Sequence, residues 1–172
     1  HTAATELGTA ITAQMQTLAM NGSRFAVGLI PCDASSNGNE TVQLQVAAHE
    51  SMPLRPLNKV ASGGELSRIS LAIQVMTSQV AAVPSLIFDE VDVGIGGRVA
   101  EIVGKLLKQL GQSHQVLCIT HLPQVAACAD HQWQVSKQAQ AEGVFSHIRP
   151  LARDERIDEI ARMLGGVDIT PI

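Results

Sequence analysis

Two short apolar runs, each ending in polar residues and separated by a helical segment, constrain this fold more than any other feature. The first, "SLIFDEV" (85–91), carries Asp89 and Glu90 at its C-terminal end, and the second, "QVLCITH" (115–121), ends in His121. Between them "GRVAEIVGKLLKQLG" (97–111) has helical spacing. A strand, a helix and a strand in this order predict a parallel pair with a right-handed crossover. Such runs are typical of strands covered on both faces, so we expect an α/β fold with a largely parallel sheet flanked by helices.

The flanking segments add further helices and antiparallel strands. We expect helices over residues 3–20, 64–80, 122–130 and 153–166, and strands over 24–31, 41–49, 131–138 and 144–151, the last two as a hairpin. The polar stretch "CDASSNGNE" (32–40) is expected to be a flexible loop. We therefore divide the chain into an entry helix, 1–20, and a main unit, 21–172.

Composition narrows the class of protein. The chain has 172 residues, of which 45% are apolar and 16% charged, and this suits one globular unit. Its net charge of −4 and the absence of a Lys/Arg run argue against a main nucleic-acid-binding surface here. Three cysteines give no disulfide framework, so a reducing compartment is expected, and no apolar run is long enough to cross a membrane. The sequence opens without an initiator Met, and we expect it to be a piece of a longer protein.

The stretch "SGGE" allows two interpretations. Ser62 and Glu65 have the spacing of a capping box, which would make this an ordinary helix start. A capping box does not need Gly63 and Gly64, which each cost about 0.5–1 kcal/mol of helix propensity relative to Ala. Glycines at this point let a foreign anion approach the backbone N–H groups of the helix end. Capping and anion binding both remain open on this pattern alone.

Polar residues follow both predicted parallel strands. Asp89 and Glu90 follow the first, and His121 follows the second. Ligands of open α/β sheets bind beyond these strand ends, where one carboxylate can hold a Mg²⁺-bound water and its neighbour can orient an attacking water. Solvated carboxylates and a structural histidine are the plainer alternatives. The combination of these three residues with the glycine turn is a more specific sign of a ligand site than any one of these features alone.

Together, "SGGELSR", "LIFDEVDVGIGG" and "ITHLPQVAACAD" resemble the C-terminal lobe of an ABC-type P-loop ATPase head of the SMC-like class, and most closely a bacterial DNA-repair branch of it. The resemblance covers roughly residues 53–166, and residues 1–20 look like the end of a coiled-coil arm entering the head. It implies ATP hydrolysis by the complete protein, in repair of DNA double-strand breaks and recombination.

The resemblance also implies a role for each site residue. The signature motif, which contacts the ATP of a partner head, would consist of Ser62, Gly63, Gly64 and Glu65. Asp89 would hold Mg²⁺ through water, Glu90 would be the general base, and His121 would be the switch histidine. The D-loop, at the interface between heads, would contain Asp92 and Gly94. Gly96 stands where such heads usually carry the D-loop Asp.

A phosphate-binding loop is missing from the sequence. No G-x-x-x-x-G-K-[ST] occurs in it, so we expect the chain alone to bind ATP and Mg²⁺ weakly and not to hydrolyse ATP. The resemblance implies an N-terminal half that carries the loop, a homodimer through paired heads, and DNA as a partner. It implies no membrane, and a location in the bacterial cytoplasm at the nucleoid.

Three rival interpretations remain. Cys118, His121, Cys128 and His131 have the spacing C-x₂-H-x₆-C-x₂-H, which could bind zinc. The chain could be a non-enzymatic dimerisation module with well-capped helices. It could also belong to another ABC-type head, such as a cohesin-like or transporter subunit.

Overall fold

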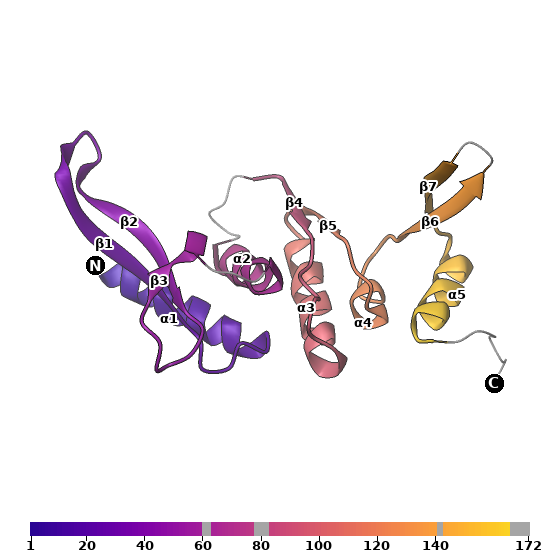
Figure 1. The fold of residues 1–172 in the computed structure, drawn as a ribbon, viewed down its shortest axis with the longest axis horizontal. Coiled ribbons are helices and arrows are strands. Elements are labelled where there is room, and N and C mark those ends of the chain that lie inside the picture. Colours follow the sequence, from indigo (N-terminus) through magenta and orange to yellow (C-terminus); the bar gives the residue numbers. More distant parts are fainter. Residues whose placement is uncertain (60–62, 78–82, 141–142, 166–172) are drawn as a thin grey trace.

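The computed structural model describes residues 1–59, 63–77, 83–140 and 143–165. Its elements follow one another along the longest axis roughly in chain order, with the β1–β2 hairpin at one end and α5 at the other (Figure 1). The helices are α1 (Thr2–Thr17), η1 (Leu57–Lys59), α2 (Gly63–Thr77), α3 (Gly97–Leu110), α4 (Pro123–Ala126) and α5 (Arg153–Met163). The strands are β1 (Arg24–Ser35), β2 (Gly38–Ala47), β3 (Arg55–Pro56), β4 (Ser85–Phe88), β5 (Gln115–Cys118), β6 (Trp133–Gln140) and β7 (Gly143–Pro150).

The first sheet is antiparallel, with strand order β1-β2-β3. The expectation of a flexible loop over residues 32–40 is wrong, because β1 runs to Ser35 and β2 starts at Gly38. The register shifts between Pro31 and Ser35, and Ser35 Oγ donates to the Gly38 carbonyl at 3.0 Å across the turn. Exposed on both faces, these residues lack the apolar alternation from which a strand is predicted.

Helix α1 packs on this hairpin and on α2. Ile11 and Met15 are fully buried, one helical turn apart, as the spacing of apolar residues predicts. Thr12 links helix and strand, because its Oγ1 donates to the Gly8 carbonyl at 2.8 Å and accepts from the Phe25 N–H at 2.9 Å. Residues 1–20 thus form part of the hydrophobic core, and their junction with a coiled-coil arm stays a prediction.

Strands β4 and β5 form the predicted parallel pair, with Ser85 opposite Gln115, and α3 is the helix of the crossover between them. The α/β class with additional antiparallel strands is confirmed, although in the described part of the chain the parallel sheet is limited to this pair. The expectation that both strands are buried on two faces is wrong. Leu86 and Phe88 face the core, whereas Ile87 is 71% exposed and Leu117 lies beside it on the open face.

The last unit is the predicted β6–β7 hairpin with α5. Glu159 of α5 accepts from Gln134 Nε2 of β6 at 2.7 Å and from Arg162 Nη2 at 2.7 Å. Hydrogen bonding to Arg162 is the main reason why the pKa of Glu159 lies below its ordinary value. The opposite face of the hairpin carries the chain's one tryptophan, Trp133, 65% exposed.

Candidate functional site

The parallel register brings the predicted catalytic residues to one edge of the sheet. The Ile119 N–H donates to the Phe88 carbonyl at 3.0 Å, so the ladder continues to the last residue before Asp89. Asp89 and Glu90 then leave β4 beside the point where His121 follows β5. All three side chains are exposed at this edge, as the sequence predicts for a ligand site.

The turn after β4 has an unusual backbone. Glu90 has φ +57°, in the left-handed region that non-glycine residues rarely adopt. Its N–H donates to Asp89 Oδ1 at 2.9 Å, and its own side chain reaches the start of α2. A Cβ at Gly63 would collide with Glu90 Oε2. The general base expected from the resemblance therefore lies against the first residue of the glycine-rich helix in the same chain.

Three further contacts join this turn to α2. Ser67 Oγ donates to the Asp89 carbonyl at 2.7 Å, and Arg68 Nη1 donates to the Val93 carbonyl at 2.7 Å. A Cβ at Gly64 would lie 3.3 Å from both the Cβ and the carbonyl oxygen of Val93. The start of α2 and the turn between β4 and α3 thus form one hydrogen-bonded unit, with the small size of Gly64 allowing the close approach.

Sequence reasoning missed Arg68, although a signal was present. Arg68 lies four residues after Gly64 and shares the buried side of α2 with Leu71 and Ala72, so it is a cation placed in an apolar stripe. Only 8% of it is exposed, and this burial lowers the pKa of its guanidinium, an effect that Glu65 partly opposes. A buried cation needs an acceptor, and the Val93 carbonyl supplies one.

Asp92 makes its contacts within its own chain. It is 2% exposed, its Oδ2 accepts from Thr120 Oγ1 and from the His121 N–H at 3.1 Å, and the same oxygen lies 3.5 Å from His121 Nδ1. The assignment of Asp92 to a nucleotide contact in the D-loop stays a prediction.

The other predicted residues have less complete environments. Ser62 lies outside the described residues, so the Ser62–Glu65 capping box is not observed. Glu65 is partly buried in the first turn of α2. Gly94 has φ +75° and is exposed, with no atom within 4 Å of where its Cβ would lie, so it provides the sharp turn of the predicted D-loop.

The zinc interpretation gains no support from the geometry. Among the described residues no three His, Cys, Asp or Glu side chains converge on a point that could hold a metal ion. Cys118 is half-buried in β5, and its pKa is raised to about 12, first by burial and then by the negative charge of Asp92.

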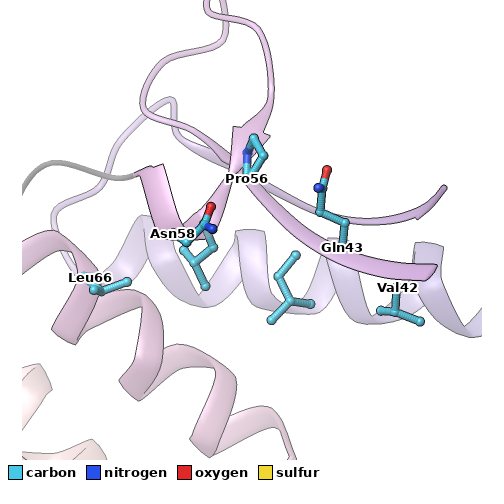
Figure 2. A pocket seen from close by; sticks show the side chains of 7 residues that line it. Val42, Gln43, Pro56, Asn58 and Leu66 are labelled. Atoms are coloured by element: carbon cyan, nitrogen blue, oxygen red, sulfur yellow. The ribbon is translucent and has the colours of Figure 1, made fainter.

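A hollow on the surface lies elsewhere, between β2, η1 and the start of α2 (Figure 2). Val42, Pro56 and Leu66 are among the side chains that line it, and none of its lining residues is charged. It therefore offers no charged side chain to a phosphate or a metal ion. Within the described part of the chain no helix is long and apolar enough to cross a bilayer.

Comparison with curated proteins finds relatives along nearly the whole chain, although no family model matches it. The DNA repair protein RecN of Vibrio cholerae is 50% identical over 169 residues, which is 97% of this chain and 30% of that protein. RecN of Haemophilus influenzae is 47% identical over 171 residues, covering 98% and 31%. RecN of Bacillus subtilis is 39% identical over 159 residues, covering 92% and 28%. The chain thus spans about 30% of the length of these relatives.

Solved structures with a similar fold are heads of SMC proteins. The Smc head domain with a coiled coil from Pyrococcus yayanosii matches with a TM-score of 0.64 at 18% identity, covering 91% of this chain and 28% of that one. An SMC ATPase described for its ATP-driven dimerisation and DNA-stimulated activation matches with a TM-score of 0.53 at 19% identity, covering 92% and 91%. At these identities the likeness shows the fold alone. Nearly the whole chain is thus homologous to one segment of the RecN proteins, and its fold is similar to that of the C-terminal lobe of an SMC-type head.

Proposed function

We propose that this chain is the C-terminal lobe of an ATP-hydrolysing SMC-like head that acts in DNA double-strand-break repair and recombination. The observation that carries the proposal is the shared edge after β4 and β5, where Asp89, Glu90 and His121 lie together and where α2 begins against Glu90. Names and identities of the RecN relatives support the biological role.

Asp89 and Glu90 would act on the nucleotide bound to their own head. Asp89 is an exposed carboxylate, a hard oxygen ligand of the kind Mg²⁺ takes, and it fits an ion that also binds substrate phosphates and water. When bound, Mg²⁺ neutralises charge that develops on the transferred phosphoryl group. Glu90 would orient the attacking water and accept its proton. His121, with 65% of its side chain exposed beside them, would lie near the terminal phosphate.

The start of α2 would act on the partner's nucleotide. Ser62, Gly63, Gly64 and Glu65 form the proposed signature motif, and a helix N-terminus favours an anion by about 0.3–1 kcal/mol where it is exposed. Gly63 is exposed and has no Cβ, so a phosphate can approach its backbone closely. Gly94, in the turn that packs on α2, would lie at the interface between the two heads.

Several partners follow from this assignment. The phosphate-binding loop absent from this sequence would be supplied by an N-terminal half of the same protein, and two heads would pair around ATP as a homodimer. ATP-driven dimerisation is described for one of the similar SMC structures, and we propose it here. DNA would be the partner of the complete protein, which we expect at the nucleoid in the bacterial cytoplasm. The chain alone is expected to bind ATP weakly and not to hydrolyse it.

The test is ATP turnover by this chain mixed with the N-terminal half of the protein. Turnover is expected only in the mixture, and Glu90→Gln should lower it roughly 10²-fold by removing the base while leaving ATP-dependent pairing intact. Glu101→Gln is the matched control, because Glu101 is an exposed carboxylate on α3 that pairs with Lys105 at 2.6 Å. Unchanged turnover in Glu90→Gln, or none in a folded and associated wild-type mixture, would favour a non-enzymatic dimerisation module.

A further inference from the structure

Asp92 makes contacts that the proposed function leaves unexplained. It lies two residues after the proposed base Glu90, yet its side chain crosses to the other strand end and meets Thr120 and His121. One oxygen, Oδ2, accepts from the Thr120 hydroxyl and from the His121 N–H, and lies 3.5 Å from His121 Nδ1. The carboxylate thus joins the turn after β4 to the turn after β5.

Thr120 extends the connection into the next helix. Its hydroxyl proton is directed to Asp92, and the same oxygen accepts from the Leu122 N–H at 3.0 Å. Leu122 is the N-cap of α4. Asp92 and the Thr120 hydroxyl that it binds therefore hold the backbone on both sides of His121. The His121 main chain is therefore fixed, while 65% of its side chain remains exposed.

The ring of His121 lies close to the same carboxylate. Its Nδ1 edge faces Asp92 Oδ2, so the opposite edge, with Nε2, points away from the carboxylate. A negative charge beside Nδ1 favours the tautomer with the proton on Nδ1, and this leaves the lone pair on Nε2 in the neutral ring. Only an acidic residue supplies this charge, whereas a neutral acceptor would satisfy Thr120 and the backbone N–H equally well.

We propose that Asp92 is a positioning residue that fixes the orientation and tautomer of His121, so that the turn after β4 and the proposed switch histidine move as one unit. The proposal rests on the proposed function for its consequence in ATP hydrolysis, but not for the clamp itself. Asp92 acts through His121 and touches no nucleotide. Its acidic character, which a D-loop contact does not explain in a buried residue, is required for the clamp.

The clamp is tested first on this chain alone, by ¹⁵N labelling of histidine. Long-range ¹H–¹⁵N spectra at about pH 8, above the ordinary histidine pKa of about 6.5, report the tautomer of each neutral ring, and His121→Gln identifies the signal. We expect the Nδ1–H form to predominate in wild type. Asp92→Asn should lower the ratio of Nδ1–H to Nε2–H by about threefold, the scale of a partly screened charge contact. Asp130→Asn, which removes an exposed carboxylate paired with Lys108, is the matched control and should leave the ratio at His121 unchanged.

The second arm measures turnover in the mixture with the N-terminal half. Asp92→Asn should lower kcat about tenfold with KM nearly unchanged, as expected for a residue that orients a functional group without contacting substrate. Thr120→Ser keeps the hydroxyl and should behave as wild type. A wild-type His121 in the Nε2–H form, or a ratio unchanged by Asp92→Asn, would overturn the clamp even if hydrolysis is observed. Absence of hydrolysis in every sample would remove the proposed function and leave the tautomer result to decide the clamp.

Discussion

Glu90 combines strain with a specific contact. A non-glycine residue in the left-handed region costs roughly 1–2 kcal/mol, and such residues persist where the surroundings hold them. Here the φ of +57° turns the side chain back over Gly63, which has no Cβ to block it. The proposed base and the proposed signature helix of one chain therefore constrain each other.

Gly63→Ala tests this contact. The added Cβ would meet the mobile end of the Glu90 side chain, so we expect the carboxylate to move and the fold to survive, with the free energy of unfolding changed by less than about 1 kcal/mol. Turnover in the assembled head should fall about tenfold, since a misplaced base loses most of its effect. Urea denaturation and ATP turnover measure the two results.

Gly28→Ala is the matched control, because its Cβ would likewise meet a side-chain end, that of Gln45 in the first sheet. It should leave turnover unchanged. If Gly63→Ala also keeps full turnover, the contact between Glu90 and Gly63 has no bearing on catalysis.

Individual site residues were predictable from sequence only in part. The shared position of Asp89, Glu90 and His121 was predictable because residues that follow neighbouring parallel strands meet at one edge. The left-handed backbone of Glu90 and the burial of Asp92 were not predictable, because the backbone of this turn is set by packing against α2 and β5 and leaves no periodic pattern.

At the scale of elements, periodicity predicted the helices and the parallel pair. It failed to predict which strand faces are exposed. The run "SLIF" predicted a strand buried on both faces, yet Ile87 is exposed. It also failed at the tip of the β1–β2 hairpin, where a polar strand carries no apolar alternation. The sequence pattern shows which residues are apolar, but it does not show which part of the protein packs against them.

Packing of α3 against α4 depends on one small residue. A Cβ at Gly104 would lie 2.8 Å from Cys128 Sγ and 3.2 Å from the Gln124 carbonyl oxygen. Gly104→Ala gains about 0.5–1 kcal/mol of helix propensity, but overpacking costs about 1–3 kcal/mol, so net destabilisation is expected. Combining it with Cys128→Ala should recover part of the loss. Additive effects of the two changes in urea denaturation would show that the two residues do not press on each other.

The described elements form an extended body (Figure 1), and large apolar side chains are exposed on several of them. Ile87 and Leu117 are opposite each other in the β4–β5 register, and Ile119, 61% exposed, continues the same open face. Trp133 and Val135 form a second apolar stripe on β6. Exposed apolar faces of this kind mark contact sites. Because the chain spans about 30% of its relatives' length, the proposed N-terminal half is the natural cover for the first face.

Without that cover, the β4–β5 face is expected to drive self-association of this chain. In the double variant Ile87→Thr with Leu117→Thr, both new residues are β-branched and suit a strand, but apolar area is removed. A loss of about 1.4 kcal/mol in the free energy of association weakens the association tenfold. We expect the double variant to show at least about a tenfold higher dissociation constant for self-association in sedimentation experiments, and a similar loss in binding the N-terminal half. Val42→Thr changes an exposed apolar residue of β2 and should have no effect on either. An equal loss of affinity in Val42→Thr would mean that association is driven by non-specific hydrophobic contact. An effect confined to the double variant would identify the β4–β5 face as the surface that the rest of the head covers.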